Sequence, residues 1–231
     1  MSEKTAIGWT DATWNPWYGC LKVSPGCKSC YMYRDMAKYG RDPLVVARSK
    51  TTFRDPLKWK DPRRVFTCSW SDFFIEQADA WRPEAWEIIR ATPHLTYQIL
   101  TKRPENILDR LPDNWRGGWP NVWLGVSAES QPYYDQRAAA LLAIPAAVHF
   151  VSAEPLLGPI DLRNARGLDW LIVGGESGPG FRPMATRWVE LIAEQCDNAG
   201  VRLFVKQDSG LQPGQRGILP PELWARKEFP R

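Results

Sequence analysis

The sequence predicts an α/β fold in which helices cover a parallel sheet, arranged as a complete or partial (β/α) TIM-type barrel. Short runs rich in β-branched and aromatic residues alternate with helical patterns along the chain. Each apolar run ends in residues that ionise or form hydrogen bonds, as barrel strands do at their C-terminal face. The rival is a doubly wound open sheet, which usually carries a glycine-rich loop after its first strand. A cysteine-rich loop stands there instead, so we favour the barrel.

The expected elements follow one another in a regular order. Strands are expected at residues 13–17, 64–70, 95–102, 121–128, 147–154, 168–175 and 201–207. Helices are expected at residues 29–38, 83–93, 104–111, 135–144 and 186–200. Between residues 38 and 64 the chain reads as a loop rich in charge and proline. We expect residues 1–231 to form a single domain.

The composition limits the class of protein. The chain is 44% hydrophobic and 24% charged, which is ordinary for a soluble globular protein, and its 13 tryptophans should lie mostly in the core. No apolar run approaches the roughly 18–20 residues that cross a membrane, and the N-terminus has no signal-peptide core. Five cysteines argue against a disulfide framework. We therefore expect a cytoplasmic protein without membrane contact.

Polar residues follow every expected strand. In a barrel these C-terminal ends share one face, and that face carries the active site. The alternative, that polar residues only mark where strands meet solvent, explains one or two ends better than all of them. After the cysteine loop, the candidate residues are Ser71, Asp72, Lys102, Arg103, Ser127, Glu129, Glu154, Glu176, Lys206 and Gln207.

Three cysteines lie in the loop WYGCLKVSPGCKSCYMYR, residues 17–34: Cys20, Cys27 and Cys30. Thiolates favour zinc, copper(I) or iron–sulfur clusters, and structural zinc requires four ligands. Three thiolates on a cubane cluster leave one iron open, and that iron can bind an amine and a carboxylate. The other cysteines and histidines lie in or beside expected strands and helices: Cys68, His94, His149 and Cys196. Zinc and iron–sulfur therefore both remain open.

The pattern Cys-x6-Cys-x2-Cys-Tyr after a first strand resembles the radical S-adenosylmethionine superfamily, whose usual spacing is Cys-x3-Cys-x2-Cys. Ser29 stands where that superfamily usually has an aromatic residue, and Tyr31 follows the last cysteine instead. A closer resemblance covers nearly the whole chain and is to a phage- and prophage-associated family. That family is marked by a three-cysteine motif and regarded as radical-SAM-like. The blocks that carry this resemblance are WNPWYGCLKVSPGCKSCY, ILTKRPE, LGVSAESQ, SAEPLLGPIDL, DWLIVGGESGPGFRP and LFVKQ.

The resemblance implies a [4Fe-4S] cluster on the three cysteines, with S-adenosylmethionine on its open iron. An electron from an external donor would cleave this cofactor to a 5′-deoxyadenosyl radical, which abstracts hydrogen from a substrate. The superfamily usually binds the methionine amine after the second strand. In this chain Ser71 and Asp72 occupy that place, although Asp72 can equally be a helix cap.

The resemblance also suggests roles for the other candidate residues. Lys102 or Arg103 would hold the carboxylate of S-adenosylmethionine. Ser127 and Glu129 would contact its ribose, and Tyr31 belongs to the same cofactor site. Glu154 and Glu176 would bind ribose hydroxyls or substrate. Lys206 and Gln207 would face the substrate, although Lys206 could equally pair with Glu154 or Glu176.

Two rival functions stay open. One is an iron–sulfur or zinc-binding phage protein without S-adenosylmethionine chemistry. The other is a nucleic-acid-binding module that uses KTTFRDPLKWKDPRR, residues 50–64, with Phe53 and Trp59 between the cations; a solvated loop is the simpler interpretation. A net charge of +4 permits an anionic partner without requiring one. The substrate, nucleic acid or protein, and the oligomeric state are left open.

Overall fold

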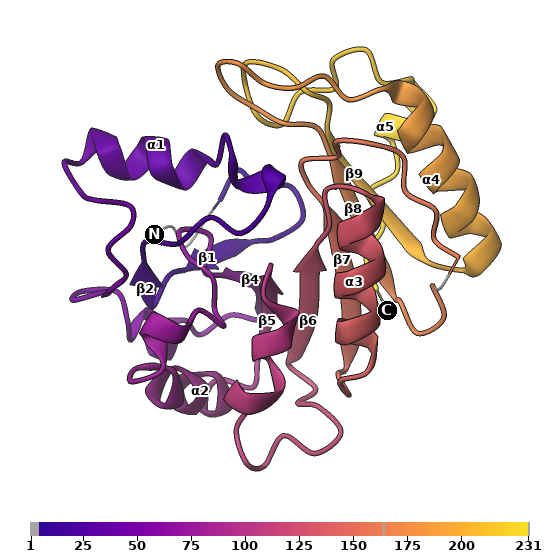
Figure 1. The fold of residues 1–231 in the computed structure, drawn as a ribbon. Helices are drawn as coiled ribbons and strands as arrows, with labels where there is room; N and C mark the ends of the chain where they lie inside the picture. The colour runs from indigo at the N-terminus through magenta and orange to yellow at the C-terminus, as the bar shows by residue number, and fades with distance from the viewer. Residues whose placement is uncertain (1–4, 164, 231) are drawn as a thin grey trace. The chain divides into compact units, whose positions relative to one another are not determined.

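The computed structural model describes residues 5–163 and 165–230 and has an α/β fold (Figure 1). Its strands are hydrogen-bonded in the order β1-β4-β5-β6-β7-β8-β9. The pairs β1–β4, β4–β5, β7–β8 and β8–β9 are all parallel, which confirms the predicted α/β class with a parallel sheet. The strands are β1 Ala12–Trp14, β4 Arg63–Thr67, β5 Leu95–Thr101, β6 Val122–Ser127, β7 Val148–Ala153, β8 Trp170–Gly174 and β9 Arg202–Gln207.

The chain forms two compact units, and each is described by itself. The first contains the described residues up to Val23, together with Cys30–Leu124 and Ile144–Ala147. The second contains Ser24–Ser29, Gly125–Ala143 and the described residues from Val148 onward. The domain predicted from the sequence spans residues 1–231, of which residues 1–4, 164 and 231 lie outside the described part.

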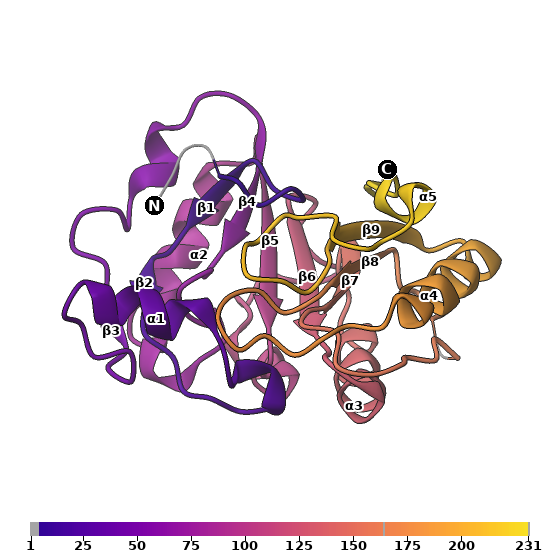
Figure 2. The same ribbon diagram turned by 90° about the horizontal axis from the view of Figure 1, so that it is seen from above.

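Helices separate most of the strands, as predicted. They are α1 Tyr31–Lys38, α2 Arg82–Ala91, α3 Gln131–Leu142, α4 Thr186–Ala199 and α5 Pro221–Trp224. In the second unit α3 packs beside β7, and both α4 and α5 pack beside β9 (Figure 2). Gly200 ends α4 in the left-handed region at φ 71°, a conformation that glycine adopts readily, and the helix ends where the sequence predicted.

Tryptophans form much of the core of the first unit, as the composition suggested. Trp14 and Trp17 are fully buried, and their indole N–H groups donate to the carbonyls of Phe53 at 3.1 Å and Asp72 at 3.0 Å. On α2, the Trp86 ring packs against Phe73, with ring centroids 5.0 Å apart. These side chains combine large apolar area with one satisfied donor.

In the second unit the core is built around β8, whose residues are all buried. Trp170 packs against Phe150 and Phe229, with ring centroids 5.7 Å and 5.4 Å apart. Its indole N–H donates to the carbonyl of Glu228 at 2.8 Å, which ties the last described residues to the sheet.

The predicted strand 13–17 is wrong as one element. β1 ends at Trp14, and a separate strand, β2 Trp17–Tyr18, pairs antiparallel with β3 Ala47–Arg48. Pro16 has no N–H to donate, and the Asn15 side chain turns away to accept the Trp70 N–H at 2.7 Å. The strand β3 lies inside the segment that we expected to be an irregular loop.

The predicted helix 104–111 is also wrong. Two single 3₁₀ turns replace it, Pro104–Asn106 and Leu108–Arg110. Prolines bracket this segment, which leaves too few residues for a stable α-helix. The side chain of Asn106 instead donates to the carbonyl of Phe74 at 2.9 Å.

Two smaller differences concern helix starts. Helix α3 begins at Gln131 rather than at residue 135, because Pro132 is accommodated in its first turn. The short helix α5 was not predicted, and its first residue is Pro221. In the part of the chain that the structure describes, no helix has the length and apolar character required to cross a membrane.

Candidate functional site

The backbone before Cys20 is held in a conformation that requires glycine. Gly19 has φ +89°, and a Cβ there would overlap the carbonyl oxygen of Val45. The Gly19 N–H donates to the carbonyl of Trp70 at 3.0 Å, and the Cys20 N–H donates to that of Pro43 at 2.9 Å. The β2–β3 pair and the loop after β4 therefore fix the backbone position of Cys20.

A buried guanidinium lies against the sulfur of Cys20. Arg103 Nη1 is 3.8 Å from Cys20 Sγ and 3.2 Å from Asp72 Oδ2, and Nη2 donates to the carbonyl of Leu21 at 2.8 Å. Burial acts to lower the pKa of Arg103, but the charges of Asp72 and Cys20 outweigh it, so that its pKa is raised. A permanent cation beside this sulfur suits a thiolate ligand.

Asp72 links the loops after β4 and β5. Its Oδ1 accepts the Phe74 N–H at 2.9 Å and the Thr101 hydroxyl at 2.7 Å, while Oδ2 accepts the Lys102 N–H at 3.0 Å and Arg103. An ionised carboxylate has about four acceptor positions. An amine that binds to Asp72 would therefore have to replace one of these donors. The alternative role as a cap is observed, since Asp72 accepts the Phe74 N–H.

Three hydroxyl groups of the first unit bind the backbone of the cysteine loop or its neighbour. The Tyr31 hydroxyl donates to the carbonyl of Ser69 at 2.7 Å, and the Ser71 hydroxyl donates to that of Gly19 at 2.5 Å. The Tyr33 hydroxyl donates to the carbonyl of Cys20 at 2.5 Å. Tyr33 was missed from the sequence, although its position three residues after Cys30 at the start of α1 could have indicated it.

Cys27 lies in the second unit, on the 3₁₀ turn Pro25–Cys27. Its N–H donates to the carbonyl of Ser24 at 2.9 Å, and its sulfur is 3.9 Å from the Ser24 hydroxyl. The carboxylate of Glu129, which is fully buried, accepts the Gly26 N–H at 3.0 Å. Glu129, two residues after the end of β6, therefore holds the turn that carries Cys27.

Each of two predicted cofactor residues pairs with an arginine. Glu129 Oε2 is 3.1 Å from Arg137 Nη1, which also donates to the carbonyl of Ser127 at 2.8 Å. Glu176 accepts the Arg182 N–H and Nε, both at 2.9 Å. Burial raises the pKa of both carboxyl groups, but hydrogen bonds and the arginine charges lower it more, so that the net shift is downward.

The strand-end residues predicted to face substrate are bound to one another or to backbone. Lys206 Nζ is 2.8 Å from Glu154 Oε1, so the ion pair considered from the sequence forms. A Cβ on Gly174 would lie 2.6 Å from the same Glu154 oxygen, so the backbone of β8 approaches this carboxylate closely. Gln207 donates to the carbonyl of Gly175 at 2.8 Å and accepts the Gly214 N–H at 2.9 Å.

The basic segment 50–64 lacks the exposed aromatic rings that base stacking requires. Phe53 is 3% exposed and Trp59 is 8% exposed, so both belong to the core. Many of the cations are paired with carboxylates at 2.7–3.5 Å: Arg54 with Glu84, Lys58 with Asp55, Arg63 with Asp61, and Arg64 with Asp11. This arrangement fits the simpler interpretation of a solvated, structured loop.

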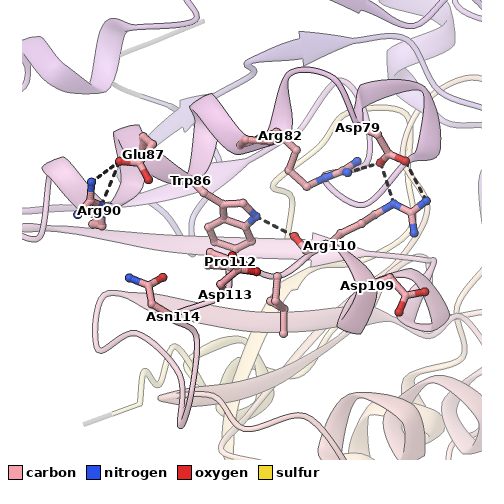
Figure 3. A pocket seen from close by; sticks show the side chains of 12 residues that line it. Asp79, Arg82, Trp86, Glu87, Arg90, Asp109, Arg110, Pro112, Asp113 and Asn114 are labelled. Atoms are coloured by element: carbon pink, nitrogen blue, oxygen red, sulfur yellow. Dashed lines mark hydrogen bonds and ion pairs between the residues drawn. The ribbon is translucent and has the colours of Figure 1, made fainter.

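A separate pocket lies between α2 and the segment after the two 3₁₀ turns (Figure 3). Several of its charged groups pair with one another: Asp79 binds both Arg82 and Arg110, the latter at 2.8 Å, and Glu87 binds Arg90. The Trp86 indole donates to the carbonyl of Arg110 at 2.8 Å. The lining includes none of the residues predicted from the sequence, so this pocket is separate from the candidate site.

The candidate residues thus form two sets within the two units. The first unit brings together Cys20, Tyr31, Ser71, Asp72 and Arg103, with Lys102 contributing its backbone N–H to Asp72. The second unit joins the Cys27 turn to Glu129 and Glu176, and separately joins Glu154 to Lys206. The buried hydroxyl of Ser127 and the amide of Gln207 lie at strand ends in the second unit.

The cysteine thiols allow a test of whether a cluster fits. Cys20, Cys27 and Cys30 are partly exposed thiols, whereas Cys68 and Cys196 are buried. Burial raises the pKa of the Cys196 thiol to about 12, and burial likewise raises that of Cys68 well above its usual value. Among the described residues no group of three or more histidine, cysteine or acidic side chains is gathered to hold a metal ion. The three loop thiols are thus more accessible than Cys68 and Cys196, but the described residues do not gather them into a metal site.

Comparison with known proteins gives one match. A family model with the description "Protein of unknown function (DUF5131)" matches residues 4–217. No curated protein and no solved structure matches the chain.

Proposed function

Because the chain belongs to the family described as "Protein of unknown function (DUF5131)", which covers residues 4–217, we propose a function from its site rather than from a named relative. We propose that it is a radical-SAM-like enzyme of the cytoplasm, on a partial (β/α) barrel, and that the family is phage-associated. Cys20, Cys27 and Cys30 would hold a [4Fe-4S] cluster, with S-adenosylmethionine as the second cofactor. When bound, this pair supplies a 5′-deoxyadenosyl radical for hydrogen abstraction.

The contact between Arg103 and Cys20 is the observation that best supports an anionic, thiolate-bound group. Arg103 is 5% exposed, and its Nη1 lies 3.8 Å from the sulfur. A buried cation is costly unless it is paired; Asp72 reaches Arg103 through one oxygen at 3.2 Å, and the half-exposed Glu76 lies 4.0 Å from its Nε. A thiolate, part of an electron-rich cluster, would add a closer anionic partner than Glu76, and the contact would give the cluster a hydrogen bond that tunes its potential.

The chain's own residues divide the remaining tasks. Arg103 already contacts Cys20 and Asp72. We therefore assign the carboxylate of S-adenosylmethionine to the side chain of the neighbouring Lys102, which is half-buried. Tyr31 and Ser71 hold the loop that contains Cys20. In the second unit, the Glu154–Lys206 pair at the ends of β7 and β9 can bind a polar substrate or exchange a proton with it.

The first experiment is anaerobic reconstitution with iron and sulfide, followed by dithionite and S-adenosylmethionine. We expect 5′-deoxyadenosine by mass spectrometry from the wild-type protein and none from the Cys30→Ala variant. Cys196→Ala is the matched control, because Cys196 is buried in α4 and lies outside the loop. Zinc at one equivalent with no uptake of iron would overturn the proposal.

A second candidate is an iron–sulfur protein that does not use S-adenosylmethionine. The observation that favours it is Asp72, whose acceptor positions are all occupied by donors of its own unit. A stable cluster that neither binds nor cleaves S-adenosylmethionine would select this candidate. In either case the electron donor is external, and a nucleic acid or a protein is the proposed macromolecular partner.

A further inference from the structure

The turn that carries Cys27 is held from two sides by groups of the second unit. On one side, Glu129 Oε1 accepts the Gly26 N–H at 3.0 Å. On the other side, Arg182 Nη1 donates to the carbonyl of Pro25 at 3.1 Å. A Cβ on Gly26 would lie 3.0 Å from the carboxyl carbon of Glu129, so the backbone approaches the carboxylate closely.

Each side of this contact is an ion pair. Arg137, 4% exposed, binds Glu129, and Arg182 binds Glu176 through a two-pronged contact between guanidinium and carboxylate. Burying such pairs costs free energy that the hydrogen bonds must offset. Three of these residues are at most 6% exposed, so the molecule places costly, well-satisfied charges around one short turn.

The same carboxylates keep some acceptor capacity. Glu129 accepts bonds from Gly26 and Arg137. Glu176 accepts bonds from the backbone and the guanidinium of Arg182. Because a carboxylate has about four acceptor positions, holding the turn does not by itself use up either carboxylate.

We propose that Glu129 and Glu176 are positioning residues, which act with Arg137 and Arg182 to fix the turn Pro25–Cys27 and thereby the direction of the Cys27 thiolate. This assignment gives the two glutamates a role in addition to the ribose and substrate contacts that the resemblance suggested. It deepens the proposed function and rests on it for the identity of the group that Cys27 binds. We call these four residues, with their contacts to the turn, the clamp. The observations that support the clamp are contacts within the second unit.

The first test measures the turn without any metal. Amide hydrogen exchange of a peptide that covers residues 24–29 would be followed in the wild-type protein and in Glu129→Ala, Glu129→Gln and Glu176→Gln. Loss of a hydrogen bond to a charged acceptor should speed exchange at Gly26 by about tenfold or more in Glu129→Ala. Glu129→Gln keeps an acceptor oxygen and should lie between the two. Glu190→Gln is the control, since Glu190 forms an exposed pair with Arg187 on α4.

The second test measures the cluster without its activity. After reconstitution, iron release to a chelator and the electron paramagnetic resonance spectrum of the reduced protein would be recorded. We expect faster release and a changed spectrum in Glu129→Ala and Glu176→Gln, and wild-type behaviour in Glu190→Gln. Exchange of the β9 peptide, residues 202–207, checks that each variant remains folded.

The possible results distinguish a failure of the clamp from a failure of the proposed function. Unchanged exchange at residues 24–29 in folded Glu129→Ala and Glu176→Gln would overturn the clamp. Faster exchange with unchanged iron release and spectrum would overturn its role in presenting Cys27. Wild-type protein that takes up no iron would overturn the proposed function, and the exchange rates would still confirm or refute the clamp by themselves.

Discussion

At Arg103, one guanidinium contacts a thiol, a carboxylate and a backbone carbonyl: Cys20, Asp72 and Leu21. All three contacts belong to the first unit, and the side chain is 6% exposed. The planar fork of arginine can serve three partners that lysine cannot reach together. The segment ILTKRPE therefore has a structural role through Arg103.

We expect Arg103→Met to lower the free energy of unfolding by about 3–5 kcal/mol, because it leaves the Asp72 carboxylate buried without its cation. Urea unfolding measures the loss. Arg90→Met is the matched control, since Arg90 is 60% exposed in its pair with Glu87 and should cost under about 1 kcal/mol. Equal losses in the two variants would contradict the role assigned to Arg103.

The lowered pKa of Glu129 predicts how the stability of the protein changes at acidic pH. The pKa of Glu129 is held below its ordinary 4.5, because hydrogen bonds and Arg137 outweigh the effect of burial. A carboxyl with a lowered folded-state pKa stabilises the protein above the unfolded pKa, and that stability is lost as the pH falls through the folded value. Between about pH 6 and about pH 3, Glu129→Gln should therefore lose less stability than the wild type. A parallel decline of the two proteins, measured by urea unfolding, would count against an ionised Glu129.

At the scale of elements, the small β2–β3 pair positions the cysteine loop. Gly19 follows β2 and approaches the backbone of Val45 just before β3, where no side chain fits. The Cys20 N–H donates to the carbonyl of Pro43, which lies two residues before Val45 in the chain. A change at Gly19 should therefore act on the loop and on the fold together.

Gly19→Ala should cost about 1–3 kcal/mol, from the strained φ and the overlap with Val45. Gly40→Ala is the matched control: it also has a positive φ, +63°, but a Cβ there meets no atom within 4 Å. We expect the control to lose less stability and to take up iron as the wild type does. Thermal unfolding and iron content measure the two effects, and equal behaviour would show that the overlap is relieved at little cost.

At the scale of the whole molecule, the net charge is +4. The segment 50–64 does not concentrate this charge, because carboxylates pair with several of its cations. Two aromatic residues of that segment are buried, so the charge permits an anionic partner without locating one.

Removal of a bound cluster should lower the melting temperature of the whole protein. A ligand present at a hundred times its dissociation constant stabilises the folded state by about 2.7 kcal/mol, which corresponds to roughly 5–10 °C for a chain of this size. We expect this shift between reconstituted and chelator-treated wild-type protein, measured by calorimetry. Cys30→Ala should show no shift, and an identical shift in that variant would indicate metal bound elsewhere.

The sequence by itself determined the order of the main strands and helices, the residues at the strand ends and the unusual cysteine loop. These features depend on local hydrophobic periodicity and on spacing, which are written in neighbouring residues. The same reasoning failed where prolines and side-chain hydrogen bonds replaced regular structure, at Pro16 and between Pro104 and Pro112.

Only the tertiary structure decided which polar groups are partners. Gly26 and Glu129 are 103 residues apart in sequence, Pro25 and Arg182 are 157 apart, and Asp72 and Arg103 are 31 apart. Periodicity identifies the face on which a side chain lies, but it does not say which distant group meets it there. A buried carboxylate must find its donors wherever the folded chain brings them. For that reason the sequence could not show that Glu129 accepts the Gly26 N–H in the turn that carries Cys27.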